Sequence, residues 1–184
     1  MIKFFYKILI FALTIFLLFT GYFAYFGFTT SKFNTIIKDQ IKKQNNDLDI
    51  ELKKIKLHLN LKNISIKIKT KNPKIIFDNT NYLEIDEIST NISISSYFKD
   101  KFAIKNLSIK SKNNKIGSYI DFYKLNYKNT LQIVLLKKFL RKGKAQINID
   151  LYFDDFGKIK NNYIITGTIL DTELAIPQNI KELK

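Results

Sequence analysis

Two patterns of apolar residues divide this chain. Residues 8–31 carry no charge and consist mainly of Ile, Leu and Phe, whereas apolar and polar residues alternate from Leu48 onward, as in residues 55–61. About 20 apolar residues in a helix span the roughly 30 Å hydrocarbon layer of a bilayer, and strict alternation is typical of strands with one apolar face. The sequence therefore predicts one transmembrane helix followed by a water-facing domain built mainly of β-strands.

The apolar run is interpreted as an anchor and not as a cleaved signal peptide. It is longer than the roughly 7–15 apolar residues of a signal peptide, and its end, residues 21–28, is bulky and aromatic without a small-residue cleavage site. Lys3 and Lys7 precede the run, and a short head with two lysines favours an amino terminus in the cytoplasm. We therefore expect the rest of the chain to lie outside the cytoplasm.

A helix is expected to continue beyond the anchor, because apolar residues recur there at spacings of three and four. These residues are Phe33, Ile36, Ile37 and Ile41. The predicted organisation is thus an anchor with an amphipathic helical extension over residues 1–43 and a β domain over residues 44–184.

Polar turns separate the alternating runs of the β domain. Strands are expected over residues 55–61, 64–69, 75–77, 83–85, 92–94, 102–109, 119–127, 145–153 and 163–169, and Pro177 is expected to end the last of them. The parity of the pattern slips between Leu61 and Ile64, so a bulge, bend or turn is predicted at residues 62–63.

One amphipathic helix is predicted to interrupt the strands at about residues 130–142. Leu131, Leu135 and Phe139 form its apolar stripe, residue 129 or 130 can cap it, and Gly143 is expected to follow its end. One modest helix cannot cover the apolar faces of so many strands. We therefore predict a mainly β fold, an elongated antiparallel sheet that curls into a groove or leaves an apolar face for a ligand.

The composition offers little for catalysis. The chain has no Cys, which excludes a thiolate zinc site and a cysteine nucleophile, and its single histidine, His58, excludes a histidine-pair metal site. The neighbouring acids at 86–87 and 154–155 would point to opposite faces of a strand, so neither pair suits general acid–base work. We find no catalytic residues, metal site or cofactor motif, and we interpret the protein as a non-enzyme.

The net charge of +15 usually indicates a partner such as nucleic acid or an anionic lipid surface. However, Arg141 is the only arginine, there is no Trp, and the lysines are scattered among Ile and Asn. This composition is typical of an AT-rich genome, and specific nucleic-acid recognition favours Arg. Nucleic acid is therefore not favoured as a partner.

The order of anchor, short helix and alternating strands resembles the AsmA-like proteins, a family that includes TamB-type and YhdP-type envelope proteins. Residues 57–69 look like the family's early paired strands, and residues 152–171 look like one of its strand–turn–strand units. The resemblance implies a single-pass bacterial inner-membrane protein whose periplasmic β-groove carries phospholipid toward the outer membrane on a hydrophobic floor. Family members are much longer, so this chain is expected to match their amino-terminal region or a reduced relative.

We therefore predict an anchored extracytoplasmic β-groove protein that binds or channels phospholipid acyl chains for envelope and outer-membrane biogenesis. The cleanest apolar faces provide the candidate floor residues, which are Ile64, Ile66, Ile147, Ile149 and Leu151. One alternative is an anchored interaction or assembly module that contacts other envelope proteins through its sheet edges. Another is a basic binder of anionic lipid headgroups or nucleic acid.

The anchor can be tested by membrane fractionation. Because an apolar helix of this length is held by burial in lipid, the protein should stay in the membrane pellet after carbonate extraction. Release of the domain as a soluble species, about 3 kDa smaller than the full chain, would show a cleaved signal peptide instead.

Overall fold

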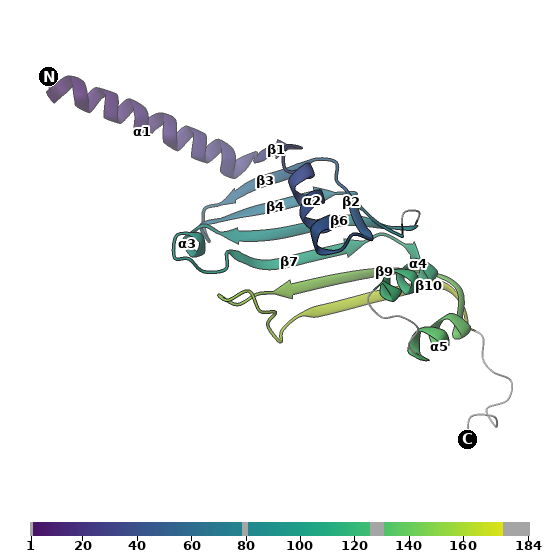
Figure 1. Ribbon diagram of the computed structural model, residues 1–184. Helices are drawn as coiled ribbons and strands as arrows, with labels where there is room; N and C mark the ends of the chain where they lie inside the picture. The colour runs from purple at the N-terminus through teal and green to yellow at the C-terminus, as the bar shows by residue number, and fades with distance from the viewer. Residues whose placement is uncertain (1, 79–80, 126–130, 175–184) are drawn as a thin grey trace.

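The computed structural model describes residues 2–78, 81–125 and 131–174, and they form one open antiparallel sheet with a long apolar helix at its N-terminal side (Figure 1). The main path through the 10-stranded sheet is β1-β3-β4-β6-β7-β9-β10, with β2, β5 and β8 attached beside it. The predicted mainly β, antiparallel architecture with one N-terminal apolar helix is thereby confirmed.

The elements are bounded as follows. The helices are α1 (Ile2–Tyr25), α2 (Asn34–Gln44), α3 (Ile94–Tyr97), α4 (Ile116–Lys124) and α5 (Leu131–Phe139). The strands are β1 (Phe28–Thr30), β2 (Leu48–Glu51), β3 (Ile55–Asn60), β4 (Ser65–Lys71), β5 (Lys74–Phe77), β6 (Asn81–Ser93), β7 (Ile104–Ser111), β8 (Asn114–Lys115), β9 (Leu140–Tyr152) and β10 (Ile164–Leu174).

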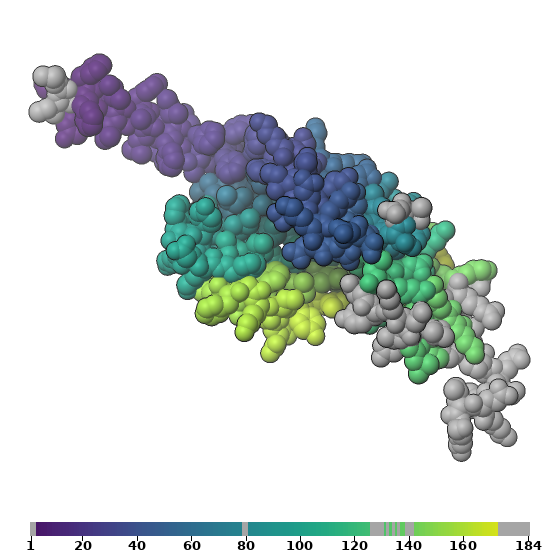
Figure 2. Space-filling view, viewed as in Figure 1, coloured from purple at the N-terminus to yellow at the C-terminus, as the bar shows by residue number. Residues whose placement is uncertain are grey.

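Helix α1 extends away from the domain (Figure 2). Its segment Lys3–Tyr25 is long and apolar enough to cross a membrane, a test that a signal sequence also passes. The helix ends where Gly27 adopts a left-handed backbone with φ of +72°. A Cβ at this position would lie 2.6 Å from the carbonyl oxygen of Leu57, so only glycine allows the chain to turn against β3.

The chain after Gly27 differs from the expected continuous helix. It first forms β1, which pairs with β3, and the segment with helical spacing is a separate helix, α2. Lys42 and Lys43 lie in the last turn of α2, where positive charge favours the helix dipole. The structure therefore has a helix where the spacing predicts one, but a short strand that the spacing does not reveal separates it from α1.

The long strand β6 belongs to two parts of the sheet. Its first residues, 81–84, pair with β5, whereas residues 87–93 pair with β4. Strand β2 pairs antiparallel with β5 and so extends the first of these two parts. The core lies at this junction, where Phe77, Leu83 and Ile85 are almost fully buried and the ring of Phe122 from α4 meets Phe77 edge-on, with centroids 5.5 Å apart.

Three local predictions differ from the structure. Of residues 119–127, expected as a strand, residues 119–124 lie in α4, because Ile116 and Ile120 share one helical face and pack against Ala145 of β9. Residues 126–127 lie outside the described residues. Ile94, expected in a strand, starts α3, and the Ser93 hydroxyl accepts a hydrogen bond from the Ser96 N–H as its N-cap.

The third difference concerns the helix predicted at 130–142. Helix α5 ends at Phe139, and β9 already begins at Leu140. Gly143 lies within β9 with φ of +140°, where a Cβ would come within 2.7 Å of the Thr172 hydroxyl on β10. Close approach of β10, and not a helix end, explains this glycine. The predicted capping residues 129–130 and Pro177 lie outside the described residues.

The turns between strands agree well with expectation. Strands β3 and β4 form an antiparallel hairpin whose connection contains residues 62–63. The predicted return at residues 154–157 joins β9 to β10, where the Asp154 carboxylate accepts hydrogen bonds from the backbone N–H groups of Phe156 and Lys158 at 2.8 and 2.9 Å. Local polar chemistry therefore sets the strand ends.

Truncation of Phe77 should test the core. Phe77→Ala should lower the free energy of unfolding by about 3–5 kcal/mol, because it leaves a cavity among buried side chains, and Phe77→Leu should cost about 1.5 kcal/mol. Urea unfolding of the detergent-solubilised protein measures both. The exposed Phe98 supplies the control, since Phe98→Ala should change stability by about 0.5 kcal/mol or less.

Candidate functional site

The register of the sheet collects apolar side chains on one face. Residues directly opposite each other in antiparallel strands point to the same side, so each row can be followed from strand to strand. One row holds Leu59, Ile66, Ile92 and Ile104; the next holds Phe28, Leu57, Ile68, Thr90, Leu107 and Leu151; the third holds Ile55, Thr70, Ile88, Ile109, Ile149 and Ile165. We call these three rows the apolar sheet face.

The opposite face of the same strands is polar. A row running across β3, β4, β6, β7 and β9 holds Lys56, Lys69, Ser89, Ser108 and Asp150. Lys69 forms an ion pair there with Glu87 of β6. This face is therefore suited to water, and the apolar sheet face is the one that needs a covering.

Much of the apolar sheet face is only half-buried. Ile66, Leu107 and Ile149 are intermediate in exposure although they lie in the middle of the sheet. Toward the edge, Ile165 of β10 is 60% exposed. Exposed apolar area of this extent is uncommon on a protein surrounded only by water and usually marks a binding surface.

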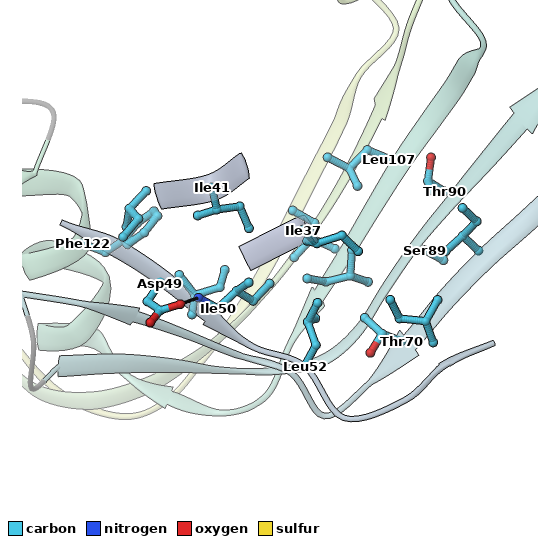
Figure 3. Close-up of a pocket in the computed structure, with 16 residues that line it drawn as sticks. Ile37, Ile41, Asp49, Ile50, Leu52, Thr70, Ser89, Thr90, Leu107 and Phe122 are labelled. Atoms are coloured by element: carbon cyan, nitrogen blue, oxygen red, sulfur yellow. Dashed lines mark hydrogen bonds between the residues drawn. The ribbon is translucent and has the colours of Figure 1, made fainter. Parts of the chain in front are cut away.

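Helix α2 covers part of the apolar sheet face and leaves a cavity beneath it. The cavity encloses about 370 Å³ and lies between α2, β2 and the sheet (Figure 3). It is lined by Ile37, Ile41, Leu48, Asp49, Ile50, Leu52, Ile55, Ile68, Thr70, Ile75, Ile88, Ser89, Thr90, Leu107, Ile109 and Phe122. A volume in this range with a nearly apolar wall is typical of ligand pockets for hydrophobic molecules.

Polar contacts hold α2 in place. The Asn34 side-chain amide donates to the carbonyl oxygens of Leu52 and Lys53, at 3.0 and 2.7 Å. Farther along the helix, the Nζ atoms of Lys38 and Lys42 lie 3.1 and 3.3 Å from Oδ2 of Asp49 on β2. Helix α2 has no fully buried residue, so these contacts along its length position it over the cavity.

The Asp49 carboxylate is the electrostatic centre of this attachment. Partial burial alone would raise its pKa, but hydrogen bonds from Lys38, the Ile50 N–H and Lys42 outweigh burial and hold the pKa below its ordinary value of 3.8. Because the charged form is favoured in the fold, this attachment is fully present at neutral pH and weakens as pH falls through the lowered pKa.

The structure brings together four of the five predicted floor residues. Ile66, Ile149 and Leu151 lie in the rows of the apolar sheet face, and Ile147 lies two residues from Ile149 on the same side of β9. Ile64 is placed elsewhere: it lies in the β3–β4 turn with φ of +45° and is 58% exposed.

Sequence reasoning missed the cavity, because its wall comes from helices α2 and α4 and from the strands β2 to β7. The helical spacing of Ile37 and Ile41 is visible in the sequence, and both line the cavity. Nothing in the sequence placed these side chains opposite Ile88 or Leu107. The alternating pattern predicts a strand at Phe122, whereas Phe122 lies in α4 beside the cavity.

Asp155, in the β9–β10 turn, has a structural role. Asp155 receives hydrogen bonds from the ammonium groups of Lys101 and Lys105 at 2.6 and 2.9 Å, and these lower its pKa to about 2. Across residues 2–78, 81–125 and 131–174, no group of three or more His, Cys, Asp or Glu side chains is arranged to hold a metal ion. The site available in this part of the chain is therefore an apolar surface with a cavity.

Comparison with known proteins adds no relative, since no family model, curated protein or solved structure matches this chain.

Neutralising Asp49 should loosen α2. Asp49→Asn keeps the acceptor for the Ile50 N–H but removes the charge that pairs with Lys38 and Lys42, a loss of about 1 kcal/mol. Hydrogen exchange should then show α2 amide protection reduced about fivefold. The difference from wild type should vanish as pH falls through the lowered pKa of Asp49, since protonation removes the same charge.

A matched control lies on the same strand. Glu51 is 55% exposed on its side chain and has Lys74 at 4.0 Å, so Glu51→Gln should leave α2 protection unchanged. Equal α2 protection in the Asp49→Asn variant and the wild type at neutral pH would show that these ion pairs do not hold the helix.

Proposed function

We propose that this protein is a membrane-anchored lipid-binding protein whose β domain holds phospholipid acyl chains on the apolar sheet face and in the cavity below α2. The observation that carries the proposal is the succession of rows across the sheet that are apolar except at Thr70 and Thr90. Much of this face stays half-exposed beside the region that α2 covers. A hydrophobic ligand would cover this area.

The chemistry of the cavity suits acyl chains better than polar substrates. Its wall consists mainly of Ile and Leu side chains, and the carboxylate of Asp49 is engaged by two lysines. Acyl chains are held by burial alone, worth about 0.8 kcal/mol per buried methylene, and require no directed polar partner. No catalytic group is required for such binding, so the proposed function is not enzymatic.

The proposed location follows from α1 and from the resemblance to AsmA-like envelope proteins. In this proposal α1 spans the bacterial inner membrane once with its amino terminus in the cytoplasm, and the β domain lies in the periplasm. The open sheet serves there as a short groove that receives phospholipid and supports its transfer for outer-membrane biogenesis. Lys3 and Lys7 at the start of the chain agree with this orientation.

A second candidate function is an interaction or assembly module that binds envelope proteins through its sheet edge. Strand β10 pairs with β9, and the uncharged residues 163–170 are exposed on both faces. Ile164 and Ile165, which point to opposite faces, are 50% and 60% exposed. An uncharged, exposed edge strand of this kind is a template for strand addition by a partner.

Photo-crosslinking in membranes should distinguish the two functions. Photoreactive residues at Ile66 and Ile149, on the apolar sheet face, should capture phospholipid because acyl chains would lie against them. Photoreactive residues placed instead at Lys67 and Asp150, the adjacent positions on the polar face, are matched controls and should capture no phospholipid. Mass spectrometry of the crosslinked protein identifies the adducts.

The opposite result would decide against lipid binding. Equal capture from both faces, or none from either, would leave the apolar sheet face without a lipid occupant and favour the interaction module. Native mass spectrometry of the detergent-extracted protein should independently show co-purified phospholipid.

A further inference from the structure

Three chain connections meet at the end of the sheet from which the anchor leaves. Strand β1 follows α1 directly and pairs with β3, with Phe28 opposite Leu57 of that strand. The β3–β4 turn, helix α3 between β6 and β7, and the β9–β10 turn all lie at this same end (Figure 1). We call this region the anchor-side end of the sheet.

Backbone and side-chain bonds join these connections into one surface. The Ile94 N–H at the start of α3 donates to the Ile64 carbonyl oxygen in the β3–β4 turn at 3.1 Å. The Phe102 N–H, which follows α3, donates to the carbonyl oxygen of Asp155 in the β9–β10 turn at 2.9 Å. Lys101 pairs with the Asp155 carboxylate as well, so the three connections hold one another in position.

The side chains that project from this surface are large and apolar. Leu61 and Ile64 are 57% and 58% exposed, Tyr97 and Phe98 are 69% and 79% exposed, and Phe156 is 88% exposed. They come from all three connections, so they form a set and not one irregular loop. Ordinary surface turns carry polar residues, and an exposed apolar set of this kind marks a surface that contacts something apolar.

The backbone conformation of Ile64 also indicates a contact outside the domain. A β-branched residue with φ of +45° is strained, and such strain persists only where the surroundings require it. The side chain gains no burial in the domain in return. A contact outside the domain would supply that gain.

Lysines surround the apolar set. Lys62, Lys99, Lys158 and Lys160 are exposed beside it in the same three connections. Aromatic and aliphatic side chains flanked by lysines are the combination that favours the headgroup region of a bilayer with anionic lipids. Tyr22 and Tyr25, at the end of α1, are exposed and suit the same depth.

We infer that the anchor-side end of the sheet inserts Tyr97, Phe98 and Phe156 into the headgroup region of the bilayer that α1 crosses. This inference rests on the proposed role of α1 as a membrane span. The domain would then stand with its strand ends on the bilayer. The first row of the apolar sheet face, Leu59, Ile66, Ile92 and Ile104, runs across the strands next to this contact. The second and third rows, farther from this end, supply residues that line the cavity under α2.

Tryptophan fluorescence provides a direct test, because the chain contains no Trp. The full-length variants Phe98→Trp and Phe156→Trp each carry one reporter at the anchor-side end. Tyr82→Trp is the matched control, since Tyr82 is 50% exposed at the start of β6, the opposite end of that strand. Each variant is reconstituted into vesicles of phosphatidylglycerol and phosphatidylcholine, with and without bromine on the first carbons of the acyl chains.

Emission from the Phe98→Trp and Phe156→Trp variants should shift to shorter wavelength on reconstitution and should lose most of its intensity in brominated vesicles, whereas the Tyr82→Trp variant should do neither. Water-like, unquenched emission at both anchor-side positions would overturn the inference. A blue shift without bromine quenching would also overturn it, because it would show that protein and not lipid covers these side chains. Equal quenching of the Tyr82→Trp variant would contradict the end-on orientation.

The test separates this inference from lipid binding in the cavity. If the Trp reporters at positions 98 and 156 are not quenched but a photoreactive residue at Ile149 captures phospholipid, only the bilayer contact is refuted. If the reporters are quenched but no phospholipid is captured at Ile149, only the proposed function is refuted. If carbonate extraction released the domain, neither reporter would be expected to reach lipid, and the inference would fail together with the anchor.

Discussion

Antiparallel pairing keeps apolar residues opposite apolar residues across the sheet, and the rest of the structure depends on this register. Ile88, Ile109 and Ile149 lie side by side on β6, β7 and β9, so three separate alternating segments produce one surface. A shift of one residue in any pairing would move that strand's apolar side chains to the wet face. The polar rows on the other side make such a shift costly, because lysine and aspartate would then enter the apolar face.

The apolar sheet face is only partly covered. Helix α2 lies over part of the central strands and is held there by polar contacts. Asn34 and the lysines that meet Asp49 attach α2 without filling the space below it. The same helix packed through a full apolar stripe would have closed the cavity. A buried cluster lies beside the cavity at the β5–β6 junction, where Phe77 and α4 meet. Side chains packed against this cluster also form part of the cavity wall; they are Leu48, Ile75, Ile88, Ile109 and Phe122.

The structure shows where the lysine side chains that give the chain its high positive charge lie. Several lysines pair with carboxylates that hold connections together, as Lys101 and Lys105 do with Asp155. Others line the polar side of the sheet or surround the anchor-side end. In the proposed function these dispersed lysines would attract the domain to an anionic membrane surface, with each nearby charge adding about 1 kcal/mol. They do not form the arginine-rich surface that base recognition favours.

Hydrophobic periodicity by itself determined the apolar helix at the N-terminus, most of the alternating strands with the turns between them, and the apolar side of each strand, because these follow from local spacing and turn chemistry. Pairing between strands then placed Ile66, Ile149 and Leu151 on one face. Periodicity was insufficient for residues 116–124, whose apolar positions fit either period until packing against Ala145 selects the helix. Only the tertiary structure decided where α2 sits, that a cavity lies beneath it, and that Ile64 belongs to the anchor-side end. Those features depend on contacts between segments distant in the chain, which no local pattern specifies.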